Sequence, residues 1–375
     1  MNLYDNKKID FTKEKMFFGE GRNTQRFDVV KYPWLDTSND KQQGLDWKHD
    51  EVPMSQDYID FNTKMLPQEK FIYTRVLQKL IFLDSLQGRA PFLTFGQIAT
   101  LPELEGVILT WTYFESCKHS RTYTHNLRNV YNDPSKIFDE SFEIQELINI
   151  ADSISGPYNT FYNYVIDYLY YKQHNLPITN EFMYKIKKQL LLALMNINIL
   201  EGVRFYSGFG AIWGLTEGQA YVPGTSKNLS LICRDENQHL ALTQKLLSYL
   251  KNNEDEGFKE VYQDSIEDFY KMFEDAQKEE NDWIDYLFSQ GSYIGLNAEM
   301  SKSYISHIIY KRMKAIGLEP IDKSNVKNPL PWINKYIQMD ETEVLAQESS
   351  IINYITGGIN NQEELDKQKL KNLLD

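Results

Sequence analysis

The chain has 375 residues, of which 42% are hydrophobic and 25% charged, a composition typical of soluble globular proteins with a sizeable core. Its net charge of −13 argues against nucleic acid or an anionic membrane surface as a partner, because both require a basic face. No apolar run is long enough to span a bilayer, and the polar amino end lacks the apolar stretch of a secretory signal. A cytoplasmic location is therefore expected.

The predicted elements are almost all helices. Residues 1–60 are expected to form an irregular N-terminal arm, residues 61–340 a helical domain, and residues 341–375 a flexible C-terminal tail. Helical patterns cover, in chain order, residues 68–89, 102–130, 142–171, 180–209, 226–250, 258–291 and 297–316. Gly156-Pro157 predicts a kink in the third of these segments. Because β-branched alternation is scarce, the predicted fold class is all-α.

Carboxylate and histidine side chains occur in four of these helices at positions where apolar core residues are expected. They are Asp84 in the first, Glu115 and His119 in the second, Glu201 in the fourth, and Glu236 and His239 in the fifth. Taken singly, a Glu-x-x-His spacing is usually a solvated helix face, and a lone buried carboxylate is usually part of a core ion pair. Several buried carboxylates in one chain require a common explanation, because each is costly unless it is paired or bound to metal.

The order of these residues matches the inward-facing pattern of ferritin-like bundles, in which two carboxylates and two Glu/His pairs hold two metal ions. Residues three or four apart share a helix face, so each pair can reach one ion. Four carboxylates and two neutral imidazoles also balance the charge of two divalent ions. These ligand types suit iron or manganese without choosing between them.

The two cysteines, Cys117 and Cys233, lie far apart, each within a helical pattern. They form neither a disulfide framework nor a thiolate zinc site. They also exclude any mechanism that needs three or more thiols within this chain.

Around the candidate ligands the sequence resembles the small, radical-generating subunit of class I ribonucleotide reductases. The similar segments are residues 83–89 (LDSLQGR), 119–125 (HSRTYTH), 200–206 (LEGVRFY), 232–236 (ICRDE) and 328–334 (NPLPWIN). They occur in the family's order, and the resemblance extends from about residue 27 to 358. The resemblance implies a ferritin-like bundle with additional helices, in which two iron ions, or alternatively manganese, are held by Asp84, Glu115, His119, Glu201, Glu236 and His239.

The resemblance also implies a radical. Tyr123 would be oxidised to a stable neutral radical when the diferrous centre reacts with dioxygen, within an apolar surround formed by Phe205, Phe209 and Ile232. The plain alternative is that Tyr123 is one more core tyrosine among the 25 in the chain.

A long-range radical path to a separate large catalytic subunit would include Trp47, Asp235 and Tyr354. Trp47 alone could be simple core, and Tyr354 a tail residue with no role.

The large subunit would be the partner of a homodimer of this chain. Ribonucleotide reduction in the family needs a thiyl radical and a reducing cysteine pair, which two cysteines within ligand helices cannot supply. Leu370, Leu373 and Leu374 share a helical face and could dock the tail into that partner. Two further classes stay open: a ferritin-like iron-storage protein, and a di-metal oxidase acting on a lipid-like ligand, in which the first-helix aspartate is typically a glutamate.

One departure from the family pattern lies in the second helix, where three residues instead of two separate Glu115 from His119. A one-residue π-bulge would absorb the extra residue and keep His119 and Tyr123 facing the metals. The rival is an unbulged helix with Lys118 at the histidine position and Thr122 at the tyrosine position. An ammonium group beside divalent ions is unfavourable, so the sequence predicts the bulge.

Overall fold

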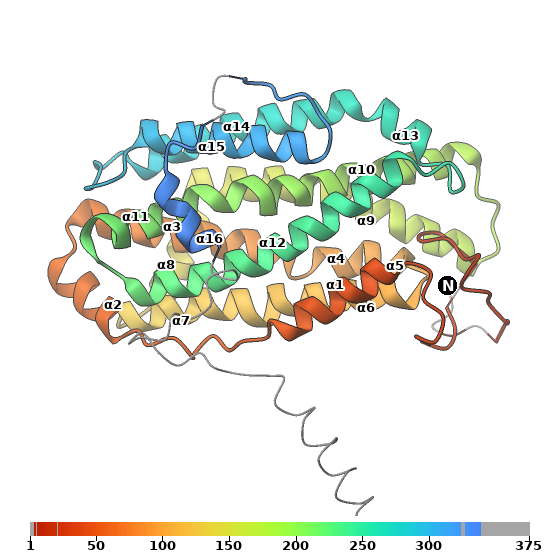
Figure 1. Cartoon of the computed structure of the whole chain (residues 1–375), viewed down its shortest axis with the longest axis horizontal. Coiled ribbons are helices and arrows are strands. Elements are labelled where there is room, and N and C mark those ends of the chain that lie inside the picture. Colours follow the sequence, from red (N-terminus) through yellow and green to blue (C-terminus); the bar gives the residue numbers. More distant parts are fainter. Residues whose placement is uncertain (1–3, 5, 21, 324–326, 339–375) are drawn as a thin grey trace, which may run out of the picture.

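The computed structural model describes residues 4, 6–20, 22–323 and 327–338. In this part of the chain the regular structure is helical, and backbone pairing of the β type is limited to two isolated bridges, Phe17 with Ala99 and Tyr293 with Leu296. Figure 1 shows the long helices running roughly along one axis in stacked layers. The all-α prediction is confirmed. The predicted tail from residue 341 onward, with Tyr354, Leu370, Leu373 and Leu374, lies outside the described residues.

The arm before residue 60 contains two helices, α1 (Pro33–Gly44) and α2 (Ser55–Ile59), so the prediction of irregular structure was wrong there. Only Leu35 and Gln42 of α1 are buried, and the rest of the helix is largely polar. It therefore lacks the apolar periodicity by which a helix is recognised from sequence. A π-helical turn, η1 (Asp60–Lys64), follows α2 directly.

Four helical rods carry the candidate ligands. Their bounds are α3 (Pro67–Gln87); α6 (Pro102–Tyr113), continued by η2 (Phe114–His119) and α7 (Ser120–Val130); α10 (Asn180–Ile199), continued by η4 (Leu200–Arg204) and α11 (Phe205–Gln219); and α12 (Pro223–Lys251). A proline opens α3, α6 and α12, where its fixed φ suits the first helical position and its missing N–H is not needed. The Thr179 hydroxyl caps α10 by accepting a hydrogen bond of 3.1 Å from the backbone N–H of Phe182.

The remaining elements surround these rods. They are α4 (Ala90–Leu93), α5 (Phe95–Ile98), α8 (Ser135–Glu140), the 3₁₀ turn η3 (Ser141–Glu143), α9 (Gln145–Gln173), α13 (Lys259–Asp264), α14 (Ile266–Leu287), α15 (Ala298–Ala315), the 3₁₀ turn η5 (Pro331–Ile333) and α16 (Asn334–Ile337). Helix α9 continues without interruption through Gly156-Pro157. The segment predicted as one helix over 258–291 is divided at Ser265 into α13 and α14. Helices α14 and α15 form an outer layer beside α10 and α11 (Figure 1).

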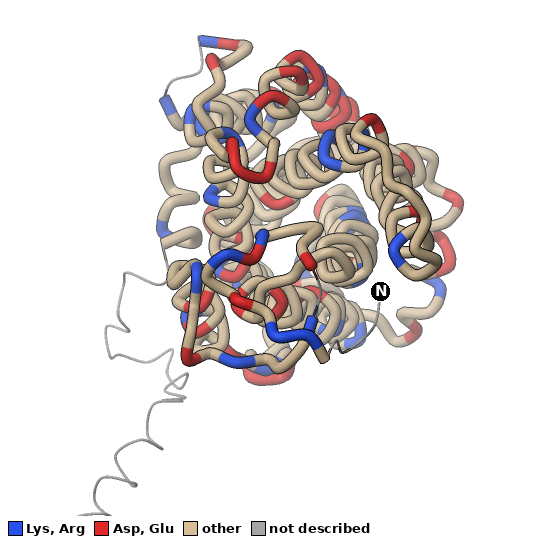
Figure 2. Tube along the Cα trace, turned by 90° about the vertical axis from the view of Figure 1, so that its right-hand side faces the viewer, with Lys and Arg blue, Asp and Glu red and all other residues tan. Residues whose placement is uncertain are grey.

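A continuous apolar core fills the space between the layers, and its largest fully buried side chains include Trp111, Trp213, Trp283 and Tyr123. Seen along the long axis, acidic and basic residues are interspersed over the elements (Figure 2). None of the helices in the described part of the chain combines the length and the apolar character needed to cross a membrane.

Candidate metal centre

The structure brings the six predicted ligands together in the interior. Each is at most 1% exposed, and they project from α3, η2, η4 and α12. Their oxygen and nitrogen atoms form two overlapping groups, within each of which the ligand atoms lie within 4.8 Å of one another. One group is Asp84, Glu115, His119 and Glu236; the other is Glu115, Glu201, Glu236 and His239. Glu115 and Glu236 belong to both groups, so these two carboxylates could contribute to the binding of both ions.

The predicted bulge is present as the π-helical turn η2, and His119 rather than Lys118 faces the cluster. The Lys118 ammonium instead donates to the backbone carbonyl of Trp47 at 2.6 Å and pairs with the Asp46 carboxylate at 2.5 Å. Because the wider turn absorbs the extra residue, Tyr123 keeps its inward position and is fully buried. The rival arrangement is excluded.

Both histidines direct Nδ1 into the cluster. His119 Nδ1 lies 3.0 Å from Glu115 Oε2 and 3.2 Å from Glu236 Oε1. His239 Nδ1 lies 2.9 Å from Glu115 Oε1 and 3.4 Å from Glu236 Oε2. The distance from His239 Nδ1 to Glu201 Oε1 is 4.0 Å. Each imidazole is thus surrounded by carboxylate oxygens.

The crowding of negative charge shows in the pKa values of the cluster. Burial, together with the charges of Glu115 and Glu236, raises the pKa of Asp84 well above its ordinary value, and burial does the same for Glu201. Burial lowers the pKa of His239, but the nearby carboxylates, Glu115 foremost, outweigh it and raise that pKa to about 10. Burial also raises the pKa of Glu115, yet His119 and His239 more than offset this and bring it to about 2. The negative charge of the surrounding carboxylates thus favours the cationic form of both imidazoles and would equally favour a bound cation.

The hydrogen bonding of the carboxylates also fits a site for metal ions. Both oxygens of Asp84 and Oε2 of Glu201 are buried and accept no hydrogen bond from any residue that the structure describes. Such orphaned carboxylate oxygens are costly in an apolar interior unless a cation binds them. Carboxylate oxygens and imidazole nitrogens are also ligands that suit iron and manganese.

Tyr123 lies one helical turn after His119, in α7, and its side chain is 0% exposed. Burial and the charges of Asp84 and Glu236 raise the pKa of Tyr123 well above its ordinary value. The Asp84 carboxylate is close enough to the Tyr123 hydroxyl to exert this effect. A tyrosine in this position stays protonated and shielded from water.

A chain of hydrogen bonds leads outward from the cluster. His119 Nε2 lies 3.3 Å from Asp235 Oδ2, and the Trp47 indole N–H donates to the same oxygen at 2.7 Å. Asp235 is fully buried and Trp47 is 3% exposed. Two of the three predicted path residues therefore stand in series with a candidate ligand, and Tyr354 lies outside the described residues.

Three further residues contact the candidate ligands and were missed from the sequence. Gln87 Nε2 donates to Glu201 Oε1 at 2.7 Å, and the Trp111 indole N–H lies 3.1 Å from both Glu115 Oε1 and Glu201 Oε1. Their spacing, three residues after Asp84 and four before Glu115, places them on the ligand faces and could have revealed them. Gln42, which contacts His239 Nε2, comes from the arm and gave no such signal.

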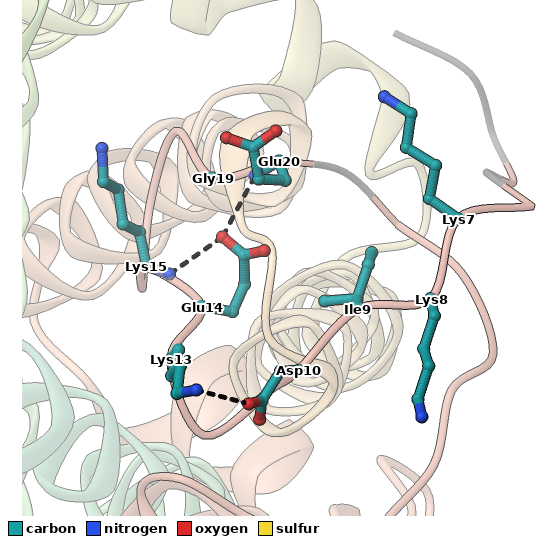
Figure 3. Close-up of a pocket in the computed structure, with 9 residues that line it drawn as sticks. All are labelled: Lys7, Lys8, Ile9, Asp10, Lys13, Glu14, Lys15, Gly19 and Glu20. Atoms are coloured by element: carbon teal, nitrogen blue, oxygen red, sulfur yellow. Dashed lines mark hydrogen bonds and ion pairs between the residues drawn. The ribbon is translucent and has the colours of Figure 1, made fainter.

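A separate hollow of about 370 Å³ lies in the N-terminal arm (Figure 3). Two of its three acidic side chains are partnered: Glu14 accepts from the backbone N–H groups of Lys15 and Glu20, and Asp10 pairs with Lys13 at 3.4 Å. None of the predicted site residues lines it, so it is not a rival to the buried cluster.

The fold and the cluster define the protein as a helical bundle with a buried carboxylate–imidazole centre of the dimetal type. Comparison with known proteins then gives the family. The family model described as "Ribonucleotide reductase, small chain" matches residues 26–329, and the chain belongs to this family.

Curated relatives named ribonucleoside-diphosphate reductase subunit beta align with nearly the whole chain. The protein from Buchnera aphidicola subsp. Baizongia pistaciae is 37% identical over 366 residues, covering 95% of this chain and 96% of its own length. The Haemophilus influenzae protein is 36% identical over 365 residues, and that of Enterobacteria phage T4 is 32% identical over 374 residues; both alignments cover 96% of each chain.

Solved structures agree with the fold. The R2 subunit of ribonucleotide reductase from Clostridium botulinum has a TM-score of 0.74 at 26% identity, covering 90% of this chain and 98% of that one. A dimanganese(II) protein from Streptococcus sanguinis has a TM-score of 0.63 at 18% identity, covering 83% and 98%, and supports the fold alone. The ferritin-like prediction is confirmed. The chain is a small subunit of ribonucleoside-diphosphate reductase, an oxidoreductase, and the iron-storage and lipid-oxidase alternatives are set aside.

Proposed function

We propose that the chain binds two metal ions through Asp84, Glu115, His119, Glu201, Glu236 and His239, and that this centre serves to generate a radical on Tyr123. Iron is the proposed metal, with manganese as the alternative that the ligands also suit. The radical is then used by a separate large subunit for the reduction of ribonucleotides. The observation that carries the proposal is the pair of overlapping ligand groups that share Glu115 and Glu236.

When bound, the two ions would supply the redox chemistry with dioxygen that oxidises the tyrosine. The chain's own contribution is to hold the reacting groups in place. Gln87 and Trp111 donate hydrogen bonds to Glu201 and so limit the orientations of this carboxylate. The surrounding core excludes water and external reductants from Tyr123, as a long-lived phenoxyl radical requires. Phe205, Phe209 and Ile232 are each 0% exposed and belong to this core.

The series His119, Asp235, Trp47 is the proposed exit path of the radical. Asp235 Oδ2 accepts from the Trp47 indole N–H and approaches His119 Nε2, so one carboxylate links the two rings. This arrangement supports transfer of an electron with the proton held at a defined atom. Tyr354 is the proposed last member on this chain.

Ribonucleotide reduction in this family needs more thiols than the chain contains, so a partner is required. Cys117 is exposed and Cys233 is buried in α12, and the chain has no other cysteine. A thiyl radical with a reducing cysteine pair must therefore belong to another polypeptide, the proposed large subunit. We further propose that the chain acts as a homodimer in the cytoplasm and that residues 341–375 dock into the large subunit.

The proposal is tested by loading metal-free protein with ferrous iron, admitting dioxygen and recording the electron paramagnetic resonance spectrum. We expect the chain to take up two irons and give a sharp organic radical signal, which Tyr123→Phe abolishes while both irons are retained. Tyr304→Phe is the matched control, because it removes another buried tyrosine hydroxyl that lacks a hydrogen-bond partner among the described residues. A radical signal that survives Tyr123→Phe would overturn the role of Tyr123, and failure to bind two ions would overturn the metal centre.

A further inference from the structure

Arg312 reaches the metal centre from α15, which carries none of the candidate ligands. Its Nε donates to the backbone carbonyl of Gly202 at 3.0 Å, and Gly202 directly follows Glu201 in the π-helical turn η4. Its Nη2 donates to the hydroxyl of Tyr206 at 2.8 Å, and the guanidinium lies over the ring of that tyrosine, 5.1 Å from its centroid. The planar guanidinium thus binds two groups at once, which a lysine ammonium could not do in the same geometry.

The turn at Glu201 is one that needs such support. A π-helical turn departs from the regular i→i+4 ladder, and isolated turns of this kind are rare because their hydrogen bonding is less regular. Gly202 allows the arginine to come close: a Cβ at this position would lie 3.3 Å from Arg312 Cγ and Cδ and 3.2 Å from Leu240 Cδ1. Arg312 therefore packs on the backbone of η4 itself, one residue from a candidate ligand.

The same contact network continues into α12. The Tyr206 hydroxyl, which accepts from Arg312, donates to Asn237 Oδ1 at 3.0 Å. Asn237 directly follows Glu236 and also donates to Cys233 Sγ at 3.8 Å. One guanidinium is thus connected to the neighbours of two candidate ligands, Glu201 and Glu236, on two different helices.

We propose that Arg312 is a positioning residue that holds Glu201, through the backbone of η4, in place for one of the two ions. That ion is the one bound by the group Glu115, Glu201, Glu236 and His239. The other group depends on Asp84 and His119, which come from α3 and η2, and the hydrogen bonds of Arg312 go to η4 and α11 instead. The inference rests on the proposed dimetal function and assigns the support of one half of the centre to a residue outside the ligand helices.

The test is a titration of metal-free protein with Mn²⁺, followed by electron paramagnetic resonance. The unaltered chain should bind two ions per chain and give the spectrum of a magnetically coupled pair. Arg312→Met should weaken the binding of one ion about 10- to 100-fold, the usual effect of losing an outer partner of a ligand. At sub-saturating Mn²⁺ the coupled spectrum should then be replaced by that of an isolated ion.

Arg204→Met is the matched control. Arg204 lies in the same turn η4 and is 3% exposed, but its guanidinium pairs with Glu279 at 2.6 Å, away from the ligands. This variant should lose stability and keep the coupled pair. Tyr206→Phe is a second variant with little change in volume; it removes one of the two acceptors that hold the Arg312 guanidinium and should weaken the same ion by a smaller factor.

Wild-type binding of both ions by Arg312→Met would overturn the inference, and so would equal losses in Arg312→Met and Arg204→Met, since these indicate a general effect on folding. If Arg312→Met does not fold, a coupled pair of unchanged affinity in Tyr206→Phe overturns it. Failure of the unaltered chain to bind two ions would instead overturn the proposed function and this inference with it. If the unaltered chain binds two ions, the results for Arg312→Met and Tyr206→Phe decide only the role of Arg312 and leave the proposed function unaffected.

Discussion

Helix α3 contributes to two fully buried charged clusters, and they differ in how their oxygen atoms are partnered. At Lys79 the ammonium contacts both carboxylate oxygens of Glu280 in α14, at 2.6 and 2.7 Å, and the Ser207 hydroxyl donates to Glu280 Oε2 at 2.6 Å. At Asp84, five residues further along, four carboxylates face two imidazoles, and both oxygens of Asp84 have no hydrogen-bond donor among the described residues. Burial of charge is common to both clusters. Only in the cluster at Asp84 do carboxylate oxygens face one another without enough hydrogen-bond donors. This shortage of donors is the feature that indicates a cation site.

The largest effect is expected from Glu236→Ala, because Glu236 belongs to both ligand groups. The variant should lose both ions, as measured by metal content after loading with Mn²⁺ and desalting. Glu280→Gln, which alters a buried carboxylate of the paired cluster, should show the reverse: both ions retained and stability reduced. Two ions retained by Glu236→Ala would contradict the shared role of this residue.

The next largest effect is expected from Lys79→Met. Removing one partner of a buried ion pair leaves an uncompensated charge, so the free energy of unfolding should fall by about 3–5 kcal/mol. Combining Lys79→Met with Glu280→Leu should recover much of this loss, because no unpaired charge then remains. Chemical denaturation measures both variants, and metal content should stay at two ions in each. A fall in metal content in the double variant would show that the two clusters on α3 are not independent.

The dependence of stability on pH should also separate the clusters. In the metal-free chain the pKa of His239 is raised from 6.5 to about 10, so its contribution to stability is fully present below pH 6.5 and is lost as the pH rises towards 10. Burial lowers the pKa of Lys79 from 10.5 to about 8, so its effect has the opposite sign: stability is gained as the pH rises from 8 to 10.5.

The difference in unfolding free energy between the unaltered chain and His239→Gln isolates the histidine, since the Lys79 contribution cancels. This difference should shrink as the pH rises from 6.5 to 10 in the metal-free state. Mn²⁺ affinity of the unaltered chain should rise over the same window, because metal binding requires the neutral imidazole. A difference that stays constant with pH would contradict the assigned pKa of His239.

Sequence patterns predicted the metal centre better than they predicted its supports. Asp84 and Glu201 stood out because each is a charge within an apolar stretch, and Glu236 because of its Glu-x-x-His spacing. The extra residue before His119 predicted the bulge η2. The second bulge, η4, has no such signal, because a π-helical turn is recognised from sequence only against a reference spacing.

Residues from distant segments that contact the ligands or their neighbours could not be predicted from sequence either. Gln42 lies in a polar helix that lacks apolar periodicity, and Arg312 lies in the last long helix, 110 residues from the carbonyl it contacts. Contacts of this kind are set by tertiary packing, which local pattern does not encode. The Lys79–Glu280 pair escaped notice for the same reason, since its partners are 201 residues apart.

The smallest effect is expected at Lys118, the residue that the bulge turns away from the ions. Its ammonium holds the Trp47 carbonyl and the Asp46 carboxylate, and its side chain is 8% exposed whereas that of Asp46 is 44% exposed. Lys118→Met should therefore lower the free energy of unfolding by only about 1–2 kcal/mol. Amide hydrogen exchange over residues 45–50 should become faster, because the segment that carries Trp47 loses its anchor.

Both ions should be retained in Lys118→Met, since His119 keeps its place in η2. Ser116→Ala is the control in the same turn: Ser116 donates only within its own helix, to the carbonyl of Thr112 at 2.8 Å, and should change neither stability nor exchange measurably. Loss of an ion in Lys118→Met alone would mean that the lysine supports the register of the bulge. Lys118 would then have to be counted among the residues that hold the candidate ligands in place.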